Sequence, residues 1–190
     1  MMCQVTCIRI FLCVIAIGIF PSAVANDEIA AICEQKLCRG ERVIQVQLDQ
    51  ERYFEIDVEG TVIAHETNIS IYPGEAFSIT AQVEDSEIVD LAPSGDSSSS
   101  VPAIRVRLDQ EVEDDGSIST MLVVQNQLDR TLRYEAYMDI DGTNQYLYTS
   151  SCPVRSQLSS FEHWPHAIVH FVMTNVRFLS EEDGDSMACE

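Results

Sequence analysis

Apolar and polar residues alternate with a period of two along much of the chain. In residues 42–48 (RVIQVQL), Ile44, Val46 and Leu48 fall on one side of an extended backbone, which is typical of a half-buried β-strand. The same alternation, or a short apolar run bounded by turn residues, predicts further strands over 52–58, 67–72, 76–83, 87–92, 103–109, 118–126, 131–140 and 167–179.

Turn residues separate these segments at regular intervals. Pro73-Gly74 and the acidic stretch 113–117 (EDDGS) each lie between two predicted strands. Asp141-Gly142 lies between two tyrosine-rich alternating runs, which predicts a β-hairpin closed by a tight two-residue turn. The serine-rich stretch 93–100 (PSGDSSSS) has the composition of a flexible loop.

The number and spacing of the predicted strands determine the expected fold class. Nine or ten short strands separated by turns, without helical patterns between them, indicate an all-β antiparallel β-sandwich rather than a parallel α/β fold. The specific expectation is an immunoglobulin-like sandwich, in which Tyr134 or Tyr137 takes the position of the corner tyrosine. A short helical or loop segment precedes the first strand.

The N-terminal residues have the three parts of a secretory signal peptide. Arg9 precedes an apolar run from Ile10 to Phe20, and the small residues Ala23 and Ala25 follow it. The 11 residues of this run are too few for a helix that crosses a hydrocarbon core of about 30 Å. We therefore expect cleavage after Ala25 and no membrane insertion of the mature chain.

This cleavage divides the chain into a signal peptide (1–25), an N-terminal segment (26–41) and one sandwich domain (42–190). The chain has 31 acidic and 11 basic residues, so the loss of Arg9 leaves 10 basic residues and a formal charge of −21 on the mature protein. Such an excess of acid disfavours nucleic acid and anionic membranes as partners, because both are bound through Lys and Arg. It allows weak binding of divalent cations, but we expect no cofactor.

Four cysteines remain after the signal peptide is removed, namely Cys33, Cys38, Cys152 and Cys189. An even number of cysteines in an exported chain predicts two disulfides. Of the three pairings, we favour Cys33 with Cys38 and Cys152 with Cys189, because each pair stays within one end of the chain. The first pair requires that any N-terminal helix ends near Cys33, since positions five apart lie about 140° apart around a helix.

Three of the four histidines lie within residues 163–170 (HWPHAIVH), beside the only tryptophan. On a helix, His166 and His170 would share one face in a spacing that binds zinc. The β-branched residues of the run favour a strand, in which these two histidines lie about 13 Å apart at ~3.3 Å per residue. We therefore expect a terminal strand at the centre of a sheet, with Phe161 and Trp164 packed at its start.

The sequence contains no recognisable catalytic or calcium motif. The acidic stretches 111–117 and 139–144 do not have the spacing of a calcium-binding loop, and no nucleophile elbow, zinc-protease motif or phosphate-binding loop is found. The sequence therefore predicts an exported, non-catalytic β-sandwich, in the periplasm or outside the cell, that binds a protein or glycan partner. One alternative is a metal-binding or metal-dependent hydrolytic protein that uses His163, His166 and His170. Another is a structural or assembly subunit.

Overall fold

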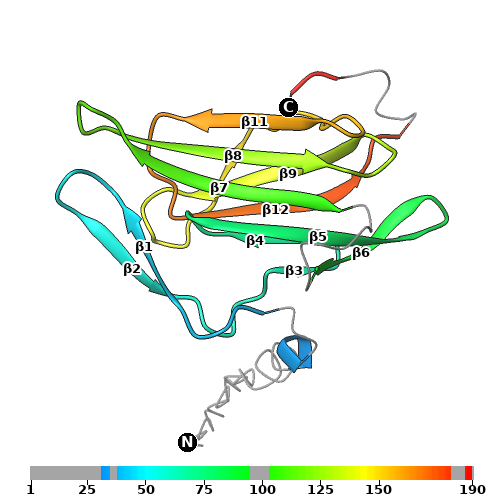
Figure 1. The fold of residues 1–190 in the computed structure, drawn as a ribbon, viewed down its shortest axis with the longest axis horizontal. Coiled ribbons are helices and arrows are strands. Elements are labelled where there is room, and N and C mark those ends of the chain that lie inside the picture. The colour runs from blue at the N-terminus through cyan, green and yellow to red at the C-terminus, as the bar shows by residue number, and fades with distance from the viewer. Residues whose placement is uncertain (1–30, 35–37, 95–102, 181–186, 190) are drawn as a thin grey trace, which may run out of the picture.

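The computed structural model describes residues 31–34, 38–94, 103–180 and 187–189, and its main feature is a pair of antiparallel sheets that face each other (Figure 1). The predicted all-β antiparallel sandwich is confirmed, whereas its immunoglobulin-like topology stays a prediction. The predicted signal peptide (1–25) and most of the serine-rich loop (95–100) lie outside the described residues. No helix in the described part of the chain has the length and apolar content that crossing a membrane requires.

Each sheet has five strands, and we name each sheet after its central strand. The β12 sheet has, in spatial order, the strands β10 (Leu147–Thr149), β9 (Leu132–Asp139), β12 (His170–Phe178), β4 (Asn68–Ile71) and β3 (Ala64–His65). The β7 sheet has, in spatial order, the strands β11 (Ser159–Trp164), β8 (Ile118–Asn126), β7 (Ile104–Val112), β5 (Glu75–Glu84) and β6 (Glu87–Pro93).

The inner faces of the two sheets form one hydrophobic core. Alternate residues of most strands point inward, among them Ile69 and Ile71 in β4 and Ile104, Val106 and Leu108 in β7. Burial of an aliphatic side chain of this size contributes roughly 1.5–3 kcal/mol, so the alternation seen in the sequence determines which face of these strands is inside.

A separate hairpin of β1 (Val43–Gln47) and β2 (Tyr53–Asp57) lies against one end of the sandwich (Figure 1). Ile44 and Val46 form a second small core with Val169, which precedes β12. The backbone N–H of Gln47 donates a hydrogen bond of 2.8 Å to Oε1 of Gln110 in β7. The hairpin is therefore attached both by apolar packing and by a hydrogen bond to the β7 sheet.

Strands β9 and β10 form the predicted hairpin, but the predicted two-residue turn is wrong. Residues 140–146 connect the two strands. The Asp139 carboxylate accepts hydrogen bonds from the backbone N–H groups of Asp141 (3.2 Å), Gly142 (2.9 Å) and Asn144 (2.9 Å). Because one side chain satisfies three backbone donors, a wider loop is stable here.

The predicted terminal strand is β12, and its central position in a sheet is confirmed. It begins at His170 because residues 165–169 cross from the β7 sheet to the β12 sheet. Trp164 packs against the core, with its ring centroid 5.3 Å from that of Phe171, as expected. The expected packing of Phe161 is wrong, since this side chain is 68% exposed.

Two further expectations about the strands need correction. The described residues contain twelve strands rather than the nine or ten expected. The alternation predicts neither β3 nor β11. The hydroxyl of Tyr134 donates to Glu162 and that of Tyr137 donates to Glu135. Neither hydroxyl donates to a backbone group of the described residues, as the hydroxyl of a tyrosine corner does, so that prediction is wrong.

Both predicted disulfides are present. Cys33 is bonded to Cys38, and Cys152 is bonded to Cys189. Residues 31–34 are helical, and residues 35–37 lie outside the described residues, so the expected end of this helix near Cys33 stays a prediction. Two disulfides fit a protein that is exported to an oxidising compartment.

Candidate functional site

The structure separates the three clustered histidines. His163 lies in β11 and points outward from the β7 sheet, His166 lies in the following loop, and His170 opens β12 and points outward from the other sheet. Because the sheets lie face to face, His163 and His170 are on opposite outer surfaces. Within the described ranges, no three His, Cys, Asp or Glu side chains are grouped so that they could hold a metal ion.

His170 is enclosed by hydroxyl and aromatic side chains. Its Nε2 lies 2.7 Å from Oγ of Ser70, and its Nδ1 lies 2.5 Å from the hydroxyl of Tyr146. The Tyr72 ring stacks on the imidazole, with the two centroids 4.2 Å apart. Burial, together with the positive charge of Arg39, lowers the pKa of His170 to about 4. The neutral imidazole donates one hydrogen bond and accepts one, which its two hydroxyl partners allow.

The Ser70–His170 contact has two elements of a nucleophile–base pair but not their usual surroundings. In such a pair a third group, usually a carboxylate, orients the base, whereas here the second ring nitrogen meets the Tyr146 hydroxyl. The adjacent cavity beside the hairpin measures about 210 Å³, below the ~300–1,000 Å³ of typical ligand pockets. We interpret the contact as part of the structure that holds β4, β12 and the loop 140–146 together.

A buried ion pair lies next to this histidine, and no pattern in the sequence predicts it. Arg39 and Glu75 are only 6% and 2% exposed. The Glu75 carboxylate accepts hydrogen bonds from Arg39 Nε (2.8 Å), from Arg39 Nη2 (2.7 Å) and from the Tyr72 backbone N–H (2.9 Å). Arg39 also donates to the carbonyl oxygen of Ser70 (2.7 Å). We call Arg39, Ser70, Tyr72, Glu75 and His170 the Arg39 cluster.

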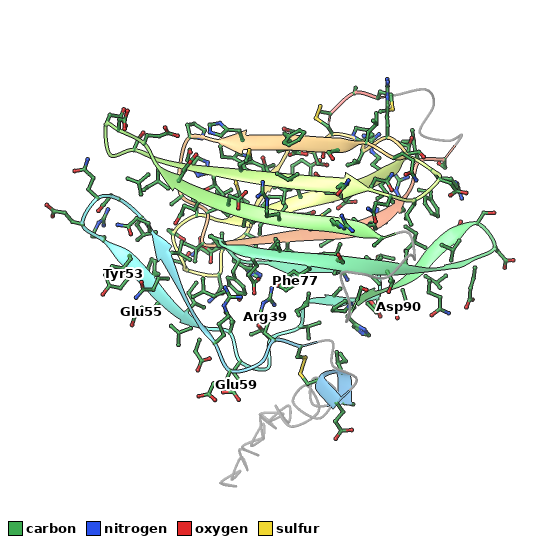
Figure 2. All side chains as sticks on the ribbon, viewed as in Figure 1. Arg39, Tyr53, Glu55, Glu59, Phe77 and Asp90 are labelled. Atoms are coloured by element: carbon green, nitrogen blue, oxygen red, sulfur yellow. A yellow bond between two sulfur atoms is a disulfide. The ribbon has the colours of Figure 1, made fainter. Side chains whose placement is uncertain are left out.

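The position of the cluster explains these contacts. Figure 2 shows Arg39 between the β1–β2 hairpin and β5, close to Phe77. The guanidinium carbon lies 4.8 Å from the Tyr72 ring centroid and 5.4 Å from that of Phe77. Both charged groups of the ion pair therefore have protein partners, and the arrangement joins the hairpin region to both sheets.

Strand β11 forms a free edge of the β7 sheet. In an antiparallel pair, residues alternate between those whose backbone groups bond to the partner strand and those whose groups point away. The Asn126 N–H donates to the Leu158 carbonyl (2.9 Å), so by register the even-numbered residues of β11 bond to β8. The backbone groups of Ser159, Phe161 and His163 therefore point away from β8, and no other described residue bonds to them.

In most strands apolar side chains face the core and charged side chains face solvent, whereas Phe161 and Glu162 in β11 show the reverse arrangement. The apolar Phe161 faces solvent, whereas the Glu162 carboxylate points inward and accepts hydrogen bonds from the Tyr134 hydroxyl (2.7 Å) and the Cys152 backbone N–H (3.2 Å). Burial raises the pKa of Glu162 and raises that of Tyr134 well above its ordinary value. Violations of local sequence rules are expected at functional sites, so the exposed aromatic ring is informative.

The outer surface of the β7 sheet next to this edge contains two arginines and a cavity of about 670 Å³. Arg105 and Arg107 in β7 line the cavity, as does Val123 in β8. Val123 is in register with Phe161 on one side and with Arg107 on the other. The cavity and the free edge therefore share one surface, which we call the β7 surface.

A weak signal for this surface exists in the sequence. Arg105 and Arg107 occupy the polar positions of the alternating segment 103–109, in a chain with only 11 basic residues. Pattern alone does not show that these positions border a cavity or that a sheet ends at β11. Comparison of the chain with models of protein families, with curated proteins and with solved structures finds no match.

Proposed function

We propose that this protein is an exported, non-catalytic β-sandwich that binds an extended segment of a partner protein at the free edge of β11. The observation that carries the proposal is the row of outward backbone groups at Ser159, Phe161 and His163, beside an exposed aromatic ring. The two disulfides support export, periplasmic or extracellular. The Ser70–His170 contact supports the non-catalytic part, because protein hydroxyls already meet both ring nitrogens.

A partner strand at this edge would extend the β7 sheet by main-chain hydrogen bonding. The three outward residues offer three N–H donors and three C=O acceptors, which provide affinity with little sequence preference. Specificity then comes from side chains on the shared face. We expect an apolar partner residue beside Phe161, where Val123 continues the apolar surface.

The charge of the protein indicates the composition of the rest of the partner. A mature chain with a formal charge of −21 attracts a segment flanked by Lys or Arg, because opposite charges accelerate association. This attraction is screened beyond about 8 Å at physiological ionic strength. We therefore expect the association rate to fall with salt, while the main-chain hydrogen bonds persist.

Two adjacent serines allow a matched test of the backbone contacts. Ser159→Pro removes an N–H that points to the free edge, whereas Ser160→Pro removes an N–H that bonds to β8. We expect Ser159→Pro to keep the thermal stability and to lose partner binding about tenfold or more. Ser160→Pro should instead lower the melting temperature. Loss of binding with Phe161→Ser would assign the side-chain part of the interaction.

A photo-crosslinking amino acid at position 161, in cells that export the protein, provides the readout. We expect one protein adduct of defined mass, which is reduced in a chain that also carries Ser159→Pro. The same amino acid at Val83, which is 47% exposed in the β5–β6 hairpin, is the control and should give none. No adduct at 161, or equal adducts at both positions, would contradict the proposal. An adduct between two copies of the chain would favour the structural or assembly alternative.

Native mass spectrometry of the unreduced mature protein tests export and the metal alternative. We expect a chain that starts at residue 26 and is four hydrogens lighter than its reduced form, because two disulfides are present. The measurement is repeated with added zinc and calcium. A stoichiometric metal ion that survives buffer exchange and is lost in His166→Ala would contradict the proposal.

A further inference from the structure

The β7 surface carries local positive charge on a strongly acidic protein. Arg105 and Arg107 occupy successive outward positions of β7, about 7 Å apart at ~3.3 Å per residue. Their partners in register on the two neighbouring strands are all uncharged, namely Ala76, Ser78, Val123 and Gln125. An anion that approaches this part of the sheet therefore meets two cations and no carboxylate in register with them.

The two arginines differ in how far protein groups neutralise them. Nε of Arg107 lies 3.0 Å from Oδ2 of Asp109, and both side chains are partly exposed. Arg105 is exposed and makes no ion pair with the described residues. An exposed arginine without a partner contributes little to folding, so its hydrogen-bonding capacity is available to a ligand.

The cavity beside these arginines has the size and composition of a ligand pocket. Its volume of about 670 Å³ lies within the ~300–1,000 Å³ range of small-molecule sites. Among the described residues that line it, two are arginines and none has a carboxylate. Ser78 and Gln125 add a hydroxyl and an amide, while Ala76 and Pro93 add apolar surface.

We propose that this cavity binds a small sugar acid. The carboxylate accepts charge-assisted hydrogen bonds from Arg105 and Arg107, whose planar guanidinium groups match carboxylate geometry. Ring hydroxyls pair with Ser78 and Gln125, and the apolar face of the ring lies on Ala76. The inference is independent of strand addition, because the arginines lie two strands away from the free edge at β11.

The overall charge limits the length of this ligand. A long polyanion would extend beyond the cavity onto the rest of the protein surface. The mature chain carries a formal charge of −21, so this surface would repel the polyanion. A mono- or disaccharide stays near the two arginines, and charges farther than about 8 Å away are largely screened at physiological ionic strength. A short sugar acid is therefore favoured over an anionic polymer.

Titration calorimetry of the mature protein with three probes tests the proposal. Digalacturonate has both a sugar ring and carboxylates, galactobiose lacks the carboxylates, and succinate lacks the ring. We expect digalacturonate to bind about tenfold more tightly than either of the others, because only it satisfies both parts of the cavity. Equal affinity for galactobiose would overturn the role of the arginines, and equal affinity for succinate would overturn the sugar assignment. No saturable binding of digalacturonate up to about 10 mM would overturn the whole proposal.

Four variants separate specific recognition from general electrostatics. Arg105→Gln should weaken digalacturonate binding about tenfold, and Arg107→Gln should weaken it less, because Asp109 already shares that guanidinium. Asp109→Asn should strengthen binding severalfold, a gain that misfolding cannot produce. Arg52→Gln, in the β1–β2 hairpin, is the control and should have no effect. Equal losses in Arg52→Gln and Arg105→Gln, or weaker binding in Asp109→Asn, would overturn the proposal.

Discussion

The Arg39 cluster and the β7 surface use similar side chains in opposite ways. In the cluster, Arg39 is buried against the Glu75 carboxylate, and His170 has a hydroxyl partner at each ring nitrogen. On the β7 surface, Arg105 is exposed and makes no ion pair with the described residues, and Phe161 is 68% exposed. The first region lies beside the hairpin, whereas the second faces solvent.

This difference separates the polar groups that stabilise the fold from the polar groups that a partner or ligand can bind. A buried charge without a partner costs several kcal/mol, so the pairing in the Arg39 cluster is a requirement of the fold. An exposed arginine stays hydrated, so it needs no charged protein partner for the fold to be stable. The free backbone groups of β11 and the arginines of β7 are therefore the groups that a partner or ligand can use.

Removal of the Arg39 charge is expected to have the largest effect on stability. Arg39→Met removes the close guanidinium partner of the buried Glu75 carboxylate and leaves it with the Tyr72 N–H and, 3.9 Å away, the exposed Arg42 guanidinium. Breaking a buried ion pair from one side costs about 3–5 kcal/mol. The free energy of unfolding, measured by urea denaturation with Trp164 fluorescence, should fall by this amount.

The double variant Arg39→Met with Glu75→Leu is the control for this prediction. It removes both charges, so no buried carboxylate is left without a countercharge, and it should recover part of the lost stability. A loss below about 1 kcal/mol in Arg39→Met alone would mean that the ion pair is not a structural requirement.

The next effect concerns His170 and pH. Its folded-state pKa of about 4 lies below the ordinary value of 6.5, so between these pH values the unfolded chain binds more protons than the folded chain. The contribution of His170 to the free energy of unfolding is therefore fully present above pH 6.5 and is lost as pH falls toward 4. This contribution is on the order of 3 kcal/mol. Urea denaturation at several pH values should show a smaller loss in His170→Asn than in the wild type. Arg105→Gln should keep the wild-type pH dependence, and an unchanged slope in His170→Asn would contradict the prediction.

The two sides of β11 should differ by a smaller but measurable amount. Tyr134→Phe removes a hydrogen bond to the partly buried Glu162 carboxylate and should cost about 1.5–3 kcal/mol in the free energy of unfolding. Phe161→Ser, on the solvent side of the same strand, should change it by about 0.5 kcal/mol or less. Equal costs for the two variants would show that Phe161 has a structural role.

The smallest effect is expected at the arginines of the β7 surface. Arg105→Gln and Arg107→Gln should each change the free energy of unfolding by about 0.5 kcal/mol or less, because both side chains are exposed. The comparison of the two regions predicts this null result in stability alongside a loss of ligand affinity. A loss above about 1 kcal/mol would place these arginines with the structural polar groups instead.

Strands β8 and β11 and the turn after β9 show which features local sequence predicts and which it does not. Strand β8 follows the predicted range 118–126, because its inward apolar residues match a period of two and pack on the core. The alternation does not predict strand β11, because the inward residue Glu162 is polar and its partners Tyr134 and Cys152 lie elsewhere in the sequence. The turn after β9 is longer than the predicted two-residue turn, because the Asp139 carboxylate accepts hydrogen bonds from the loop backbone.

The sequence by itself determined the all-β class, most of the strands and, through four cysteines, the two disulfides. These features depend on local periodicity and on residue chemistry, which short stretches of chain already contain. Only the tertiary structure decided that His163 and His170 face opposite ways, that Arg39 meets Glu75, and that β11 ends a sheet. Periodicity determines which residues share a face of a strand. The pairing of distant segments determines whether that face meets the core, another charge or solvent.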